Sequence, residues 1–430
     1  MQTLTNQAPR ERILKPLVAA LAAVASCNVA WADEPTPFYI GAKQTFLRDS
    51  NVYRIPDGPH DYISSTSLIG GLDQQISRQR LYASLNVAYN KFHNATQLDN
   101  TSYGVNAGWD WATIEKLTGN FNVTANQALA NFDGNNTQNA ASTSKNLVKT
   151  DQIAAGIKWG GEGILSLEGN YAHSRVRYSA PEYLSSESTG DTASIAGYYR
   201  VGATLRLGLG YRGTRTESPH AIPLVPAPVT EADFGSNTTT GHNIDLIADW
   251  RYSPQTSVNA RISHTRQTNS NSQVEDFSGA TGAITANYAP TAKLAFQLQV
   301  GRDAGAYANF FNVVAPTVPV GGTTTPSTNQ PYGLTQGSQT TNFAEIGARY
   351  EATAKINANA GYRYRLAKTS ATLGDQDDKL QIYTLGLTYD ITRIIQFGCT
   401  YAHENRDVSG GTVFSYKDNT FGCSAQIMLR

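Results

Sequence analysis

Charged side chains at alternate positions of short segments are the residues of this chain best placed to do chemistry. Arg363 and Arg365 are two residues apart, so in an extended strand both point to the same face. Rows of arginine along a pore set a preference for anions, including an acidic polymer. The alternative is that each arginine solvates the wall and pairs with a carboxylate of the next strand. The candidate pore-lining residues are Arg80, Asp110, Lys158, Glu168, Arg206, Arg212, Asp245, Asp249, Arg261, Lys355, Arg363 and Arg365.

These candidates form a mixed wall that leans basic. Lys355 is predicted to share a strand with Arg363 and Arg365, which would make the C-terminal third the most basic part. Many neighbours are uncharged polar residues, for instance Asn120 and Asn122. Such side chains suit a hydrated solute that exchanges hydrogen bonds as it moves.

Patterns for catalysis or metal binding are not evident. The seven His show no metal-ligand spacing, and we find no Gly-x-Ser-x-Gly and no phosphate-binding loop. His173, His264 and His403 lie in ordinary alternating segments without a nucleophile motif. We therefore expect no enzyme activity, no cofactor and no metal site.

The elements that must position the charged residues are β-strands with one apolar and one polar face. In residues 293–302 the apolar Leu294, Phe296, Leu298 and Val300 alternate with small or polar residues. The same period of two recurs roughly every 20 residues from Phe38 onward. The pattern predicts an all-β protein.

Composition separates a membrane barrel from a soluble β-sandwich. Only 16% of residues are charged, whereas a soluble protein carries about 25%. The mean hydropathy of −0.37 excludes a bundle of membrane-spanning helices. Barrel strands need apolar residues on their outer face alone. The formal net charge of zero argues against nucleic acid as a partner.

The N-terminus resembles a secretory signal. Arg10, Arg12 and Lys15 precede an apolar stretch at 17–25, and Ala-Trp-Ala at 30–32 fits a cleavage site. We expect a signal peptide at 1–32 and a single barrel domain at 33–430. A second interpretation is a lipoprotein signal with Cys27 as the lipidated residue. Both place the barrel in a Gram-negative outer membrane.

Two kinds of connection alternate along the chain. Eight short ones, candidate periplasmic turns, lie near residues 77–78, 114–116, 160–162, 200–202, 253–255, 289–291, 352–353 and 390–392. Nine longer, polar ones, candidate extracellular loops, lie at 49–60, 94–100, 133–145, 180–191, 217–239, 268–276, 304–340, 370–377 and 408–411. Together they predict a transmembrane antiparallel barrel of 18 strands, or 16 if one hairpin is misassigned. A barrel of about 16 to 18 strands leaves an aqueous channel unless something plugs it.

Aromatic residues near the predicted strand ends are typical of the two interfacial girdles of a membrane barrel. The set near the periplasmic turns is Trp109, Trp111, Trp159, Tyr199, Trp250, Tyr252, Tyr288 and Tyr389, and the opposite set is Tyr89, Tyr171, Tyr211, Tyr362 and Tyr401.

Cys399 and Cys423 stand symmetrically about the turn at 410–411, so we expect them to lie opposite or nearly opposite each other in a hairpin, on its outward phase. A disulfide suits an oxidising compartment. The alternative interpretation is that the two cysteines are small apolar residues that face lipid. The sequence leaves both interpretations open.

Two N-terminal stretches resemble the EpsL family, the exosortase-associated outer-membrane proteins of exopolysaccharide loci. They are DSNVYR at 49–54 with PDG at 56–58, and RQRLYASL at 78–85 continuing to NTSYG at 100–104 and WDW at 109–111. The resemblance implies a porin-like barrel that takes part in polysaccharide export. Its expected partners are outer-membrane lipid, the polysaccharide and periplasmic export proteins.

Two other functions remain open at this level. One is a surface or adhesion barrel that acts through its long loops 217–239 and 304–340. The other is a general diffusion porin for small solutes. For the loop 304–340 we expect its apolar first half, with Phe310 and Phe311, to pack on the wall or constrict the lumen.

Overall fold

The computed structural model shows one closed antiparallel sheet of 18 strands. It describes residues 36–114, 116–132, 143–161, 163–223, 232, 234–272, 274–304, 338–371, 374–410 and 414–429. The strands are β1 (Phe38–Asp49), β2 (Asp61–Ile76), β3 (Gln79–Phe92), β4 (Asn100–Ala112), β5 (Leu117–Leu129), β6 (Leu147–Trp159), β7 (Leu165–Tyr178), β8 (Ser188–Val201), β9 (Leu205–Pro223), β10 (Phe234–Ser253), β11 (Thr256–Asn269), β12 (Phe277–Thr291), β13 (Leu294–Ala304), β14 (Ser338–Thr353), β15 (Ile356–Ala371), β16 (Gly374–Asp390), β17 (Ile395–Ser409) and β18 (Tyr416–Leu429).

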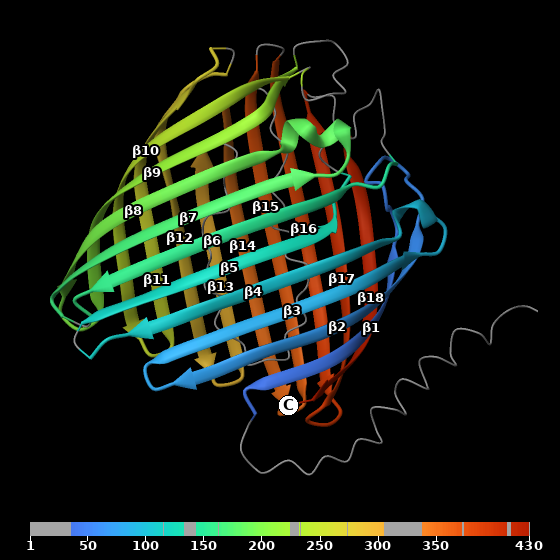
Figure 1. Cartoon of the computed structure of the whole chain (residues 1–430), viewed down its shortest axis with the longest axis horizontal. Helices are drawn as coiled ribbons and strands as arrows, with labels where there is room; N and C mark the ends of the chain where they lie inside the picture. Colours follow the sequence, from blue (N-terminus) through green and yellow to red (C-terminus); the bar gives the residue numbers. More distant parts are fainter. Residues whose placement is uncertain are drawn as a thin grey trace, which may run out of the picture. The chain divides into compact units, whose positions relative to one another are not determined.

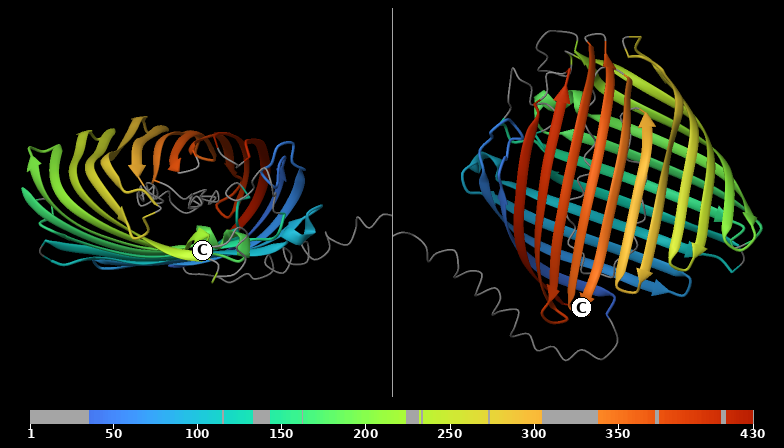
Figure 2. Two further views of the ribbon diagram at one scale, coloured as in Figure 1. Left: turned by 90° about the horizontal axis from the view of Figure 1, so that it is seen from above. Right: turned by 180° about the vertical axis from the view of Figure 1, so that it is seen from behind.

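Each strand pairs with the next one along the chain, and β1 closes the sheet against β18 (Figure 1). The seam between these two strands runs from Ile40 opposite Leu429 to Asp49 opposite Thr420. Figure 2 shows the tilted strands passing around a continuous wall. The predicted barrel and its strand number are confirmed.

Short turns join the strands at one end of the barrel, where β1 begins and β18 ends. Gly160 and Gly202 adopt φ values of 100° and 66° in two of these turns, a conformation that side chains disfavour. In barrels of this kind the short turns are periplasmic, so the longer connections at the other end are extracellular. Two short 3-10 helices, η1 (Thr96–Leu98) and η2 (Pro181–Ser186), lie in those longer connections.

Two predicted loops are wrong in length, because the strands run further than the sequence suggested. β9 reaches Pro223 and β10 begins at Phe234, within the predicted loop 217–239. β15 and β16 likewise continue to Ala371 and from Gly374, within the predicted loop 370–377. Polar residues occupy both faces of these extensions. The alternation of apolar and polar residues is therefore lost in these extensions. The backbone hydrogen bonds between the strands continue, because they need no particular side chain.

The outer face of the barrel is apolar and exposed. Leu68, Leu246 and Ile262 are 65%, 61% and 63% exposed, and similar residues recur on the same phase of the other strands. Such a surface is stable in lipid and not in water. A closed barrel with this surface is the architecture of outer-membrane proteins. None of the helices in the described residues is long and apolar enough to cross a bilayer.

Most of the predicted girdle residues are exposed on this outer face. They are Trp109, Trp159, Tyr199, Trp250, Tyr252, Tyr288 and Tyr389 toward the short turns, and Tyr89 toward the other end. Tyr171, Tyr211 and Tyr401 are also exposed, but each is the seventh residue of its strand counted from the short turn, so the prediction that they lie near the opposite strand ends is wrong. Trp111 and Tyr362 are half-buried, the first with its ring centroid 6.3 Å from that of Trp109 and the second 4.7 Å from that of Tyr383.

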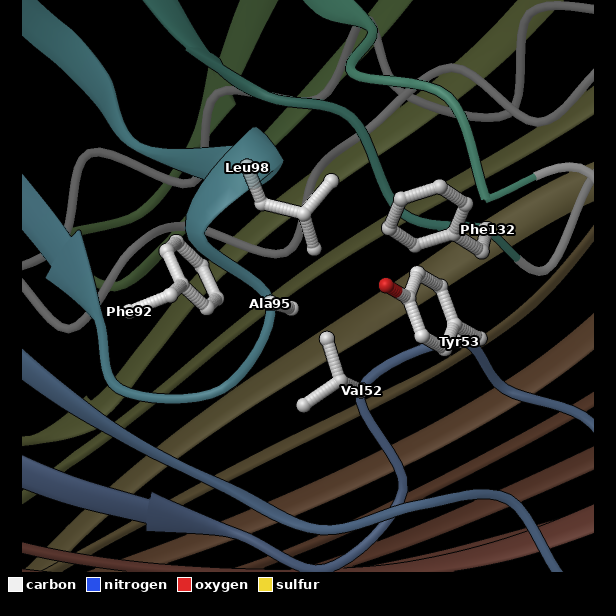
Figure 3. Close-up of a cluster of buried hydrophobic side chains, with 6 residues drawn as sticks. All are labelled: Val52, Tyr53, Phe92, Ala95, Leu98 and Phe132. Atoms are coloured by element: carbon white, nitrogen blue, oxygen red, sulfur yellow. The ribbon is translucent and has the colours of Figure 1, made fainter.

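The largest buried apolar cluster lies among the extracellular connections. Val52 and Tyr53 from the β1–β2 loop meet Phe92, Ala95 and Leu98 around η1. Phe132, just after β5, completes the cluster, with its ring centroid 5.2 Å from that of Tyr53 (Figure 3). We call these six residues the loop cluster. It joins three successive connections into one packed unit.

Three predictions fall outside the described residues. They are the signal peptide at 1–32, the lipidation of Cys27 and the packing of Phe310 and Phe311 in the loop 304–340.

Candidate functional site

The inner wall is formed by the residues that alternate with the exposed apolar ones. On β9, Leu207, Leu209 and Tyr211 are exposed to the outside, so Arg206 and Arg212 belong to the opposite, inner phase. The same argument puts all the candidate charged residues except Lys355 on the inner phase of their strands. They occupy the inner phase of β3, β4, β6, β7, β9, β10, β11 and β15.

Lys355 is the exception, and the prediction that it shares a strand with Arg363 and Arg365 is wrong. β15 begins at Ile356, so Lys355 lies in the short turn before it. Its ammonium group donates to the backbone oxygen of Ile391 in the next turn, 3.3 Å away. The turn uses Lys355 to bridge two connections at the barrel's edge.

Arg206 is at the centre of a group of ion pairs on the inner phase of β6 to β10. Its guanidinium donates to Asp249 at 2.9 Å and also contacts Glu168. Lys158 lies 3.4 Å from the same Glu168. The guanidinium also stacks over the ring of Tyr198, 4.0 Å from its centroid. The charges of the two cations and the two carboxylates therefore sum to zero.

A second group surrounds Asp245 on β10. Arg212 lies 3.1 Å from its carboxylate and Arg261 lies 3.5 Å away. Arg261 also donates to Ser263 at 2.8 Å. Asp303 on β13 lies near enough to act electrostatically on Arg261. Asp303 was not recognised from the sequence, because only the register of the folded sheet brings it near β11.

The C-terminal arginines are paired in the same way. Arg363 contacts Glu345 through two hydrogen bonds of 3.2 Å. Arg365 lies 2.9 Å from Asp378, and Arg406 binds the same carboxylate through two hydrogen bonds of 2.9 Å. The side chains of this last group are 10% exposed or less.

Arg80 binds Asp73 on the neighbouring strand through hydrogen bonds of 2.9 and 2.8 Å, and Asp110 lies 3.9 Å away on its other side. Each basic residue proposed for a strand of the wall therefore has a carboxylate partner. The described contacts favour the reading in which the arginines pair with wall carboxylates over the reading in which they attract anions. A paired charge projects much less field into the lumen than a single one.

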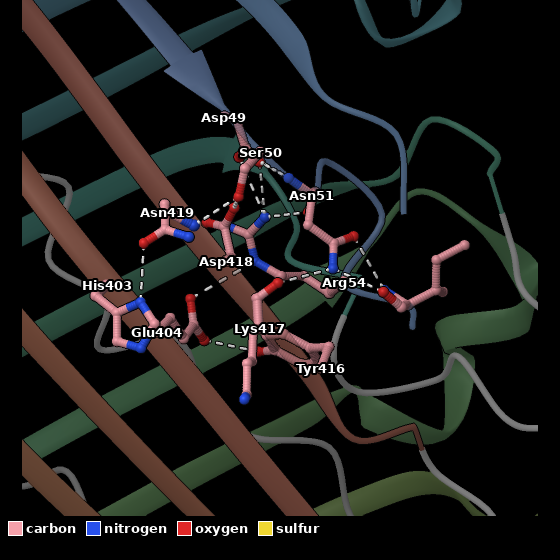
Figure 4. Close-up of polar contacts among 11 residues, drawn as sticks. Asp49, Ser50, Asn51, Arg54, His403, Glu404, Tyr416, Lys417, Asp418 and Asn419 are labelled. Atoms are coloured by element: carbon pink, nitrogen blue, oxygen red, sulfur yellow. Dashed lines mark hydrogen bonds and ion pairs between the residues drawn. The ribbon is translucent and has the colours of Figure 1, made fainter. Parts of the chain in front are cut away.

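Sequence reasoning missed the role of Arg54, although its segment had drawn attention as a family resemblance. Arg54 lies in the β1–β2 loop with a φ of 54°, and its guanidinium reaches carboxylates on three strands (Figure 4). Asp49 on β1 and Asp418 on β18 each lie 3.1 Å away, and Glu404 on β17 lies 3.6 Å away.

Burial alone would lower the pKa of Arg54, but the three carboxylates outweigh this and raise it, so the group stays charged. The segment around Arg54 is held in place by local hydrogen bonds. Asn51 donates to the backbone oxygens of Ile55 at 2.7 Å and Lys417 at 3.0 Å. Ser50 donates to Asp418 at 2.8 Å. A Cβ at Gly58 would collide with Asn51, so glycine is required there. We call Arg54 with Asp49, Glu404 and Asp418 the seam cluster.

The two cysteines left open by the sequence are joined in the structure. Cys399 on β17 and Cys423 on β18 are direct partners in the register and form a disulfide. Phe397 and Phe421 on the same phase are exposed, so the bond lies on the outer face. It plays no part in the inner wall.

Within the described residues, no group of three or more His, Cys, Asp or Glu side chains is arranged to hold a metal. His173 and His403 make single hydrogen bonds, with Asp191 and Asn419, on the outer phase of their strands. The arrangement is suited to passing hydrated solutes along a wall that is polar and largely neutral.

No protein-family model and no curated protein matches the chain. Crystal structures similar to it include two from Pseudomonas aeruginosa. OccK1 (OpdK) has 9% identity and a TM-score of 0.43, with 91% of this chain and 98% of that chain covered. OccK2 (OpdF) in complex with glucuronate has 10% identity and a TM-score of 0.44, with 92% and 98% covered. The copper transporter OprC has 12% identity and a TM-score of 0.41; 88% of this chain is covered, and the chain spans 62% of that protein. At these identities the likeness extends to the fold and not to what passes through the barrel.

Proposed function

We propose that this protein is an outer-membrane channel for hydrated solutes and takes part in the export of extracellular polysaccharide in a Gram-negative bacterium. The observation that carries the channel is the closed barrel of 18 strands with a polar inner phase. A barrel of about this size encloses more space than its own side chains fill. The export role rests on the sequence resemblance to the EpsL family. Periplasmic export proteins are the partners that this role implies.

The pairing of the inner charges fits such a role. A long polymer with many hydroxyl groups would stall on strong, isolated charges, whereas charges held in ion pairs leave a weaker field. The polar residues between the pairs can exchange hydrogen bonds with a moving chain. This supports passage of a polymer or of small solutes alike.

Conductance of the purified full-length chain in planar lipid bilayers tests the channel. We expect discrete steps of current in potassium chloride. A protein that inserts into the bilayer and gives no current steps contradicts the proposal.

The phenotype of a deletion strain tests the export role. We expect less polysaccharide at the cell surface and retention of the polymer in the periplasm. A diffusion porin would leave surface polysaccharide intact and slow the uptake of small solutes. A surface or adhesion barrel would leave both intact and change only attachment.

A further inference from the structure

A group of asparagine side chains on the inner phase of β4 to β7 is not used by any ion pair. Asn106 lies on β4, Asn120 and Asn122 on β5, and Asn170 on β7. The outward neighbours Trp109, Phe121 and Tyr171 are exposed, which puts these asparagines on the lumen side. We call the four residues the asparagine patch.

Two members of the patch are tied to the neighbouring wall. The amide nitrogen of Asn122 donates to Asn106 Oδ1 at 2.7 Å and to the hydroxyl oxygen of Tyr82 on β3 at 3.1 Å. These bonds fix the direction of the Asn122 amide and connect β3, β4 and β5 by side chains. The patch therefore has a defined geometry over several strands.

Gly156 on β6 makes room for the other two members. Asn120 and Gly156 are direct partners in the register, and so are Gly156 and Asn170. The side-chain oxygens of both asparagines approach the place that a Cβ of residue 156 would take, the second at 2.9 Å. The two amides converge over the glycine from opposite sides. Any larger residue at 156 would push them apart.

The amide nitrogens of Asn106, Asn120 and Asn170 donate no hydrogen bond to the described part of the chain, and the three side chains are exposed. Each amide offers two donors and an oxygen acceptor without net charge. Sugar hydroxyls present the same mixture of donors and acceptors. The patch thus matches hydroxyl groups better than it matches carboxylates or ammonium groups.

The charged residues next to the patch take part in ion pairs. Asp110, the register partner of Asn120, lies 3.9 Å from Arg80, and Lys158, on the same strand as Gly156, lies 3.4 Å from Glu168. Arg80 is shared with Asp73, so the charges that the described residues place next to the patch are neutral or negative in sum and do not select an anionic ligand.

We propose that the asparagine patch is a binding subsite for uncharged sugar units of a polyhydroxylated chain moving through the lumen. The inference rests on the proposed channel function and adds the class of substrate. Several weak hydrogen bonds would hold successive sugar units briefly and release them, which suits transport better than tight binding.

Current blockade by oligosaccharides tests the subsite on the full-length protein in planar bilayers. We expect maltohexaose to interrupt the ion current of the wild type, and hexagalacturonate of the same length to do so no better. In the triple variant Asn106→Ala, Asn120→Ala and Asn170→Ala, we expect maltohexaose binding to weaken about tenfold, with the ion current retained.

Two matched controls separate the subsite from general damage. Asn359→Ala removes an exposed inner amide on β15 and should leave blockade unchanged. Gly156→Ala keeps every amide but displaces Asn120 and Asn170, so it should weaken blockade. Gly347→Ala adds the same methyl group on the inner phase of β14, at a place where no atom lies within 4 Å. This variant should leave blockade unchanged.

The outcomes distinguish the subsite from the channel. Equal blockade of the wild type and both patch variants, or blockade by hexagalacturonate alone, overturns the subsite while the channel stands. Absence of ion current in the wild type overturns the channel itself. If the triple variant does not fold, the comparison of Gly156→Ala with Gly347→Ala decides.

Discussion

The inner wall formed by β4 to β7 and the wall formed by β9 to β17 share one strand pattern but use it in different ways. In the first, the side chains of the asparagine patch keep free hydrogen-bonding groups toward the lumen. In the second, Asp245, Glu345 and Asp378 each hold one or two arginines in ion pairs. The number of charged residues on a wall is therefore a poor guide to what the wall attracts. The groups left without a protein partner are the better guide.

The largest effect is expected from removing a carboxylate that holds two arginines. Asp378→Ala removes the buried carboxylate that Arg365 and Arg406 share, and we expect a loss of about 4 kcal/mol in the free energy of unfolding. Denaturant unfolding in lipid vesicles measures it. The control is Asp377→Ala, whose exposed pair with Lys368 spans 3.8 Å and should contribute less than about 1 kcal/mol. Equal effects would mean that the charged wall is not held together by its pairs.

The seam cluster should come next. Arg54→Met leaves Asp49, Glu404 and Asp418 facing one another, and we expect the free energy of unfolding to fall by about 3 kcal/mol. Arg48→Met, at an exposed position on the outer phase of β1, is the control and should have little effect. An unchanged unfolding curve for Arg54→Met would show that the backbone ladder alone closes the barrel.

Removal of the disulfide should have a smaller effect on stability and no effect on either inner wall. Replacing Cys399 and Cys423 by Ser opens a link across 24 residues, and we expect a loss of about 2 kcal/mol. Ion selectivity and sugar blockade should stay at wild-type values because the bond lies on the outer face. A change in ion selectivity would show that the disulfide affects the lumen.

The smallest effect concerns ion selectivity. Arg363→Gln leaves Glu345 unpaired, and we expect the preference for cations over anions to rise about twofold. The double variant Arg363→Gln with Glu345→Gln should return to wild-type selectivity, because it removes both charges of one pair. Reversal potentials in a salt gradient measure this. If the single variant equals the wild type, the pair has no influence on passing ions.

The strand number and the positions of the turns could be predicted because each depends on local sequence. A lipid-facing strand must alternate, and a tight turn needs residues such as those at 160–161. The ends of β9, β10, β15 and β16 could not be predicted, because the strands continue where lipid no longer imposes the alternation.

The ion pairs could be foreseen only as a possibility. Arg206 meets Glu168 across 38 residues and Arg406 meets Asp378 across 28, and both contacts depend on the register between strands. The contacts of Arg54 could not be predicted for another reason. Its loop conformation, with a positive φ and three carboxylates from distant parts of the chain, has no local signature in the sequence.

The seam cluster has a consequence for how the barrel can open. The pair β1–β18 is the one strand pair that no hairpin holds together, and in any barrel it is the natural place for a sideways opening into the bilayer. Here Arg54 binds Asp49 on one side of that seam and Asp418 on the other, at its extracellular end. Separating β1 from β18 at that end would break the contact of Arg54 with one of the two carboxylates. We therefore expect the extracellular end of the seam to stay closed.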